Sequence, residues 1–100
     1  MYRSSTPKQI FDLPFNYEKF VDKINITYKQ KDDIIIEKTE ADVQHEGNSV
    51  FFTFSQEETN KFVGDSVVKI QIKIKDKSGD VLISDIFEKL VYEVLNDKVL

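Results

Sequence analysis

The chain has 100 residues, and its 18 acidic and 14 basic side chains give a formal net charge of −4 at pH 7. A chain of this length folds as one domain around a single core; its mild acidity argues against a nucleic-acid surface as the main role, and the absence of cysteine excludes disulfides and thiolate metal sites. No apolar run approaches the roughly 20 residues of a membrane helix, and the start lacks the apolar region of a signal peptide, so we expect a soluble protein that is not exported by that route.

The first twenty residues predict an arm, a strand and a turn. Residues 1–7 are expected to form a flexible arm, so that the predicted domain comprises residues 8–100. Residues 8–15 are rich in apolar side chains, but Pro14 cannot donate to a ladder, which favours an edge strand or an extended lead-in. Residues 16–20 predict a loop or a single helical turn.

Short strands separated by turns follow. Residues 22–30 alternate, and this places Ile24, Ile26 and Tyr28 on one face of a strand. The next predicted elements, in chain order, are a tight turn at 31–33, a strand at 34–38 that is apolar on both sides at its start, a short polar strand at 42–46 built around Val43, and a turn at Gly47-Asn48.

The clearest pattern lies between Gly47 and Ser84. Two alternating runs predict strands whose buried faces carry Val50, Phe52 and Phe54 in the first and Val68, Ile70, Ile72 and Ile74 in the second. Between them, Ser55 and Glu58 form the pattern of a capping box, which predicts a short helical turn crossing from one sheet to another. Gly64 is expected to end that turn in a left-handed conformation.

The turn after the second run consists of Asp76-Lys77-Ser78-Gly79-Asp80, which are typical hairpin residues. The segment 85–95 beyond it is ambiguous. Ile86, Phe87, Leu90, Val91, Val94 and Leu95 fit a helical stripe. A strand is also compatible with the pattern, and we favour it because residues 81–83 follow a hairpin turn and need to pair with residues 69–75.

Six or seven short strands about ten residues apart, joined by one helical crossover, predict an all-β fold. We expect an immunoglobulin-like antiparallel β-sandwich of about seven strands. The cysteine and tryptophan marks of antibody domains are absent, so the prediction concerns the architecture alone.

No arrangement of side chains in the sequence predicts catalysis, a cofactor or a metal. The single histidine, His45, lies in a short polar segment and has no partners in the pattern of a triad. Asp76 and Asp80 lack the dense oxygen spacing of a calcium loop and are read as turn residues. Glu57 and Glu58 are read as a solvated cap rather than as a catalytic pair.

Several side chains are candidates for protein contact. Phe51 and Phe87 are expected on strand faces opposite the core, where they are available to a partner unless a second sheet covers them. Val99 and Leu100 are apolar residues that a monomer has little reason to leave in water, so we expect the terminal segment to pack on its own sandwich or on a neighbouring copy. Lys69, Lys73, Lys75 and Lys77 form a basic stripe, which is the wet face of a sheet or a weak contact for an acidic partner.

A series of short phrases occurs along the chain in a set order: Leu13-Pro14-Phe15, Ile26-Thr27-Tyr28-Lys29-Gln30, Ile36-Glu37-Lys38, Phe54-Ser55-Gln56-Glu57-Glu58-Thr59 with Phe62, Val68-Lys69-Ile70-Gln71-Ile72-Lys73, Ser84-Asp85-Ile86 and Val94-Leu95. In this order the chain resembles a family of small, mostly uncharacterised proteins encoded in the structural regions of tailed phages and prophages of low-GC bacteria. The chain departs from the family at Lys73, where the family often has Arg, and at 96–98, where the family has a turn of small residues.

The resemblance implies a role in the virion or in its assembly, in the tail or baseplate, and it carries over no site residues. We therefore expect a non-enzymatic structural or assembly protein that docks to other phage structural proteins or to itself, in the bacterial host cytoplasm and then in the virion. No nucleic acid, membrane or small-molecule substrate is expected. The alternative is a stand-alone bacterial β-sandwich module that binds a carbohydrate or a peptide.

Overall fold

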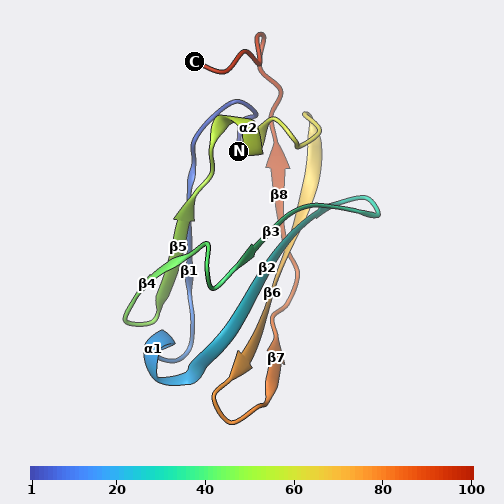
Figure 1. The fold of residues 1–100 in the computed structure, drawn as a ribbon. Coiled ribbons are helices and arrows are strands. Elements are labelled where there is room, and N and C mark those ends of the chain that lie inside the picture. The colour runs from blue at the N-terminus through green and yellow to red at the C-terminus, as the bar shows by residue number, and fades with distance from the viewer.

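Figure 1 shows a computed structural model of the protein, which describes all 100 residues. The chain forms eight strands and two single-turn helices. In chain order these are β1 (Lys8–Asp12), α1 (Tyr17–Phe20), β2 (Val21–Gln30), β3 (Asp33–Thr39), β4 (Gln44–Glu46), β5 (Ser49–Thr53), α2 (Gln56–Thr59), β6 (Ser66–Asp76), β7 (Val81–Ile83) and β8 (Phe87–Val91).

The strands make two antiparallel sheets, one with the order β1-β5-β4 and one with the order β3-β2-β6-β7, in which β8 also pairs with β6. This confirms the predicted all-β sandwich, and α2 carries the chain from the first sheet to the second (Figure 1). In immunoglobulin constant domains the first and second strands lie in the same sheet. Here β1 lies in the three-stranded sheet, and β2 lies in the five-stranded sheet between β3 and β6. The likeness to those domains is therefore one of architecture and not of strand order.

The core is built on the pairing of β2 with β6. Ile26 lies opposite Ile72, and Tyr28 lies opposite Ile70, so their side chains share the inner face of the sheet. The alternation of both strands was predicted, and all these side chains are buried. The hydroxyl of Tyr28 donates to Gln9 Oε1 at 2.9 Å, which satisfies the polar end of this buried ring. Burial raises the pKa of Tyr28 far above its ordinary value.

Aromatic rings fill the space between the sheets. The ring of Tyr28 lies edge-on to Phe54, with the centroids 5.0 Å apart, and Phe54 has the same arrangement with Phe52 at 5.0 Å and with Phe62 at 5.9 Å. Edge-to-face contacts of this kind add to the stabilisation from burial alone. The cluster joins β2 of one sheet to β5 of the other and to the segment after α2.

Both helical turns are capped at their start, and the capping box of α2 was predicted from the sequence. The side chain of Asn16 accepts from Lys19 N at the start of α1. Ser55 Oγ accepts from Glu58 N at 3.1 Å, and Glu58 Oε1 accepts from Ser55 N at 3.0 Å, which completes the capping box of α2. The other oxygen of Glu58 pairs with Lys38, whose ammonium group lies over the rings of Phe52 and Phe54.

Two turn details differ from the predictions. Asp65, and not Gly64, has the positive φ of 53° after α2. Gly64 is required for a different reason, because a Cβ there would lie 2.5 Å from Glu93 Oε2. The short strand β4 begins at Gln44, so that Val43, its expected centre, precedes it and packs against the core.

The segment 85–95 contains a strand, as favoured, and not a helix. β7 pairs with the end of β6 and β8 with its beginning, along the same side of β6. Between Ile83 and Phe87 the chain advances four residues, while the opposite positions on β6, Lys73 and Ile70, are three residues apart. β7 and β8 are thus two halves of one strand with a one-residue insertion, which is the count of a β-bulge.

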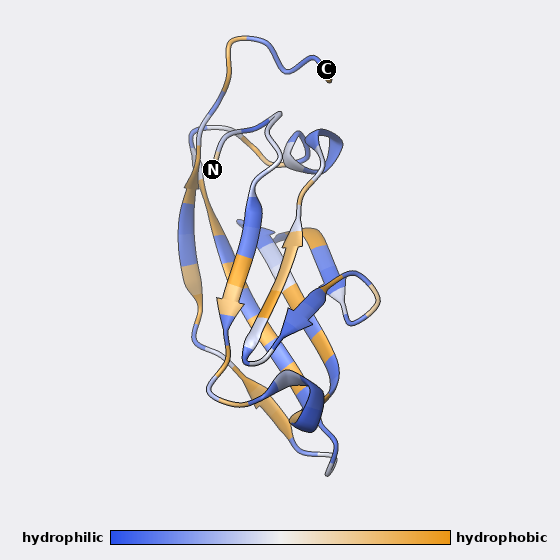
Figure 2. Ribbon diagram, turned by 90° about the vertical axis from the view of Figure 1, so that its left-hand side faces the viewer, coloured by the Kyte–Doolittle hydropathy of each residue, from blue (hydrophilic) through white to orange (hydrophobic).

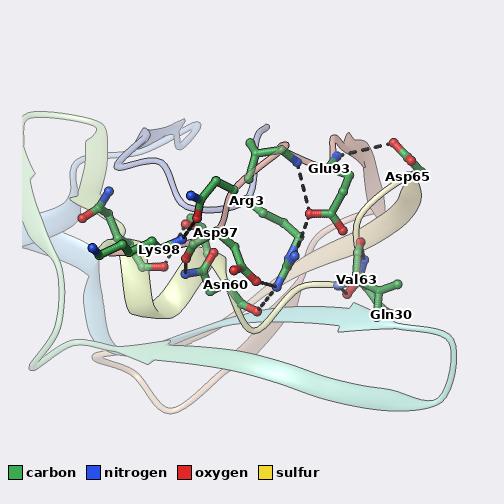
Figure 3. A network of polar contacts seen from close by, with 12 residues as sticks. Arg3, Gln30, Asn60, Val63, Asp65, Glu93, Asp97 and Lys98 are labelled. Carbon is green, nitrogen blue, oxygen red and sulfur yellow. Dashed lines mark hydrogen bonds and ion pairs between the residues drawn. The ribbon is translucent and has the colours of Figure 1, made fainter. Parts of the chain in front are cut away.

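The first residues are fastened and do not form a free arm. Met1 and Arg3 bond to the backbone of Leu90 and Tyr92 at the end of β8, through Met1 N to Leu90 O, Tyr92 N to Met1 O and Arg3 N to Tyr92 O. The guanidinium of Arg3 donates to Glu93, to the carbonyl of Asn60 and to Asp97 (Figure 3). The first three residues of the predicted arm therefore lie beside the end of β8, where Tyr2 and Tyr92 form a parallel bridge.

We predict that replacing Ile72 with Ala lowers the free energy of unfolding by about 2–4 kcal/mol, because a buried side chain is removed from the centre of β6. Chemical denaturation measures the change. Lys73→Ala, at the exposed neighbouring position, is the control and should change stability by less than about 0.5 kcal/mol. An unchanged midpoint for Ile72→Ala would contradict the core assignment.

We predict that Glu58→Gln lowers the free energy of unfolding by about 1 kcal/mol at pH 7. Burial raises the pKa of Glu58, but hydrogen bonds from Lys38 and Ser55 outweigh it and hold the pKa below its ordinary value of 4.5. The contribution of this carboxylate is therefore fully present above about pH 4.5 and is lost as the pH falls through the lowered pKa of the folded state.

Denaturant titrations from pH 7 to pH 3 should accordingly show the difference between wild type and Glu58→Gln shrinking on acidification. Glu57→Gln, on the exposed side of the same helix, is the matched control and should change stability by less than about 0.5 kcal/mol. A difference that stays constant to pH 3 would contradict a role for the ionised carboxylate.

Candidate docking edge

The β7 and β8 strands and their flanks form an apolar edge of the five-stranded sheet, here called the β7–β8 edge. Seven of its large apolar side chains are between 43% and 59% exposed: Val81, Leu82, Ile83, Ile86, Phe87, Leu90 and Tyr92. Figure 2 shows β7 as a hydrophobic strand along its whole length. Single exposed apolar residues are ordinary on protein surfaces, but several of them close together along one sheet edge favour an interaction surface.

The other sheet edges are protected in the ways that natural proteins use. Edge strands are normally blunted by charged or polar side chains, which discourage pairing with another chain. The polar residues of these edges are Lys8 and Asp12 in β1, Asp33, Glu37 and Lys38 in β3, and Gln44, His45 and Glu46 in β4. β7, by contrast, consists of Val81, Leu82 and Ile83 alone.

The backbone of β7 is also open to a partner. Ser84 N donates to Ile72 O at 2.9 Å, so Ser84 is a hydrogen-bonded position of the ladder with β6. Because such positions alternate in antiparallel pairs, the N–H and C=O groups of Ile83 and Val81 point away from β6. At the far end of the edge these outward positions are covered, since Met1–Arg3 bonds to Leu90 and Tyr92.

Ser84 holds the two halves of the edge in place. Its hydroxyl accepts from Ile72 N at 2.9 Å and donates to Asp85 O at 2.8 Å, and its carbonyl accepts from Gln71 Nε2 at 3.0 Å. The one-residue insertion takes the N–H of Ile72 out of the regular ladder, and the hydroxyl of Ser84 accepts its hydrogen bond instead. The insertion therefore interrupts the edge without loosening it.

The four predicted contact residues lie in three separate places. Phe51 is half-buried on the outer face of the three-stranded sheet, beneath the ammonium group of Lys8 at 4.6 Å. Phe87 is 44% exposed within the β7–β8 edge. It does not lie opposite the core, as was expected, because its ladder partner is the buried Ile70 and its ring is 6.4 Å from that of Phe11.

Val99 and Leu100 lie beyond β8, near α2. Leu100 N donates to Gln56 Oε1 at 2.9 Å, and Asn60 Nδ2 donates to Asp97 O at 2.9 Å (Figure 3). These contacts are polar, while the Leu100 side chain is fully exposed and that of Val99 is 41% exposed. The terminal segment is thus tied to α2 through its backbone and leaves its apolar side chains in water.

The side chains considered for chemistry remain dispersed. His45 stacks on Tyr17, with the ring centroids 4.2 Å apart. Asp76 closes its hairpin, where hydrogen bonds from Ser78 and the backbone of the turn lower the pKa of its carboxyl. No group of three or more His, Asp or Glu side chains is placed to hold a metal ion. Neither helix is long and apolar enough to cross a membrane.

The sequence contains the signal for the β7–β8 edge, but only one residue of this edge, Phe87, was predicted from the sequence as a contact residue. The signal is the uncharged run from Val81 to Ile83 after a hairpin turn. It becomes meaningful only once β7 is known to be an edge strand. In comparisons with known proteins, no family model, no curated protein and no solved structure matches the chain.

We predict that deleting residues 98–100 changes the free energy of unfolding by less than about 1 kcal/mol, because the apolar side chains removed are exposed. Thermal melts of the truncated and full-length chains measure this. Sedimentation velocity of both tests the remaining expectation, that the segment packs on a neighbouring copy, since only the full-length chain should then associate. A large drop in melting temperature with no change in sedimentation would contradict the observed exposure of Val99 and Leu100.

Proposed function

We propose that the protein is a non-enzymatic docking module whose β7–β8 edge accepts an extended, mainly apolar segment of a partner protein. Adding a strand to an open sheet edge provides affinity through main-chain hydrogen bonds and specificity through side-chain contacts. The observation that carries the proposal is the contrast between β7, which has no polar side chain, and the polar edges β1, β3 and β4.

A partner segment fits this edge better than a second copy of the chain. β7 has three residues, so pairing two copies through β7 joins few residues and falls short of the roughly 1,000 Å² that a specific interface buries. A longer segment of another protein pairs with β7 and continues over the neighbouring apolar side chains, Ile86 and Phe87. We therefore take a partner protein as the occupant.

The setting that we propose is the assembly of a tailed-phage or prophage particle, in the tail or baseplate, with other structural proteins as partners in the host cytoplasm and then in the virion. This part rests on the resemblance of the sequence to that family. The dispersed positions of the titratable side chains support a role without catalysis. A carbohydrate-binding role has less support, since sugar sites use clustered aromatic rings and no aromatic ring lines the hollow of about 660 Å³ on the five-stranded sheet.

The edge is tested with Ile83→Pro. Proline removes the N–H of Ile83, which points away from β6, and leaves the pairing of β6 with Leu82 and Ser84 in place. Ile83→Val, which keeps the N–H and a branched side chain, is the matched control. Extended peptides selected from a bead-displayed random library on the wild-type protein should bind Ile83→Val within twofold and Ile83→Pro at least tenfold more weakly.

Circular dichroism melts establish that each variant is folded, and Leu82→Lys, which puts a charge on the edge, replaces Ile83→Pro if that chain does not fold. Two results would overturn the proposal. Selected peptides that bind every variant equally would place the docking surface elsewhere. Self-association of the wild type that Ile83→Pro abolishes would make a second copy the occupant.

A further inference from the structure

The outer face of the five-stranded sheet carries an accumulation of lysines, here called the lysine face: Lys23, Lys29, Lys31, Lys69, Lys73 and Lys75. Five of these project from β2 and β6 on the side opposite the isoleucines of the core, because side chains alternate along a strand. The sixth, Lys31, follows β2 directly. This surface adjoins the β7–β8 edge and shares Val81 and Ile86 with it.

Four of these lysines form two cross-strand pairs of like charge. Lys29 lies directly opposite Lys69 in the ladder, and Lys23 lies directly opposite Lys75. Like charges directly opposite in an antiparallel pair destabilise a sheet. The ion pairs of the structure join Arg3 to Glu93 and Asp97 and Lys38 to Glu58, so none of the six lysines is neutralised by an ion pair within the chain.

The face is also hollowed. An open hollow of about 660 Å³ runs from Lys31 and Lys69 to Lys73, and a second of about 360 Å³ continues from Lys73 to Lys75. Both are lined by Asn25 and Lys73, so they are neighbours along the strands. Six lysines and three carboxylates, Asp32, Glu37 and Glu40, line the two hollows and give them a net charge of +3 in a chain whose net charge is −4.

We propose that the lysine face binds an acidic polypeptide segment in an extended conformation. Six residues separate Lys69 from Lys75, which is roughly 20 Å at about 3.3 Å per residue. An extended segment that lies along the strands has the same residue spacing, so acidic side chains on its inner side can meet the lysines in turn. Its other side chains can contact the apolar residues that line the hollows, Ile34, Ile86 and Val81.

The lining favours a polypeptide over a nucleic acid. Proteins that bind single strands stack the bases on aromatic rings, and neither hollow has an aromatic ring in its lining. Arginine, the usual residue for phosphate and base recognition, occurs only once, and Arg3 is held by Glu93 and Asp97.

The test uses a fluorescein-labelled peptide of about nine residues that alternates Glu with Val, and anisotropy as the readout. Lys69→Gln/Lys73→Gln should weaken binding at least tenfold. Lys19→Gln/Lys61→Gln, which removes the same charge from exposed positions outside the hollows, is the matched control and should change binding less than twofold. A peptide with Gln in place of Glu should not bind measurably.

Thermal melts should show that the Lys69→Gln/Lys73→Gln chain is about as stable as wild type, because the substitution removes both the repulsion between Lys29 and Lys69 and the attraction between Lys69 and Glu88, which lies opposite it on β8. Ile83→Pro should bind the Glu peptide within about threefold of wild type, which separates failure of this proposal from failure of the docking edge. The proposal is overturned by absence of binding to wild type at millimolar peptide, by equal losses in the two double variants, or by an oligothymidine that binds as tightly as the Glu peptide.

Discussion

The pairing of β2 with β6 is the constraint on which the rest of the structure depends. Its register sets Ile26 against Ile72 and Tyr28 against Ile70, and the same register sets Lys29 against Lys69 on the other face. A one-residue slip of either strand would exchange the two faces of that strand. The apolar core and the lysine face are therefore two results of one register, and the aromatic cluster around Tyr28 secures it by joining the two sheets.

The remaining strands flank this pair, and they differ in how many charged side chains they expose to solvent. β3 covers one side of β2 and has charged side chains, as a solvent-facing edge requires, while β7, on the far side of β6, has none. At the end of the molecule near α2, ion pairs hold the elements together, whereas apolar packing does so in the middle. Lys38 and Glu58 close the core beside Phe52 and Phe54, and Arg3 gathers the two ends of the chain.

Much of the fold could be predicted because it depends on patterns among neighbouring residues. The alternation of β2 and β6, the capping box of α2 and the Asp76 hairpin each involve neighbouring residues, and each is present as expected. The failures are non-local. The fastening of Met1–Arg3 depends on contacts with residues some ninety positions away, and the need for glycine at position 64 arises from Glu93. The candidate edge is also a non-local feature. The sequence of Val81–Ile83 is that of a buried strand, and only the strand order of the sheet shows that one side of β7 is open.

The one-residue insertion at Ser84 also limits what the open edge can become. A continuous apolar edge is a template on which identical strands add without end, and that is the geometry of fibrils. Here the phase of the pleat changes between Ile83 and Phe87, so a flat strand that matches β7 is out of step with β8. Strand addition along this edge is interrupted after a few residues, so the insertion limits the use of the exposed β7 strand as a template for aggregation.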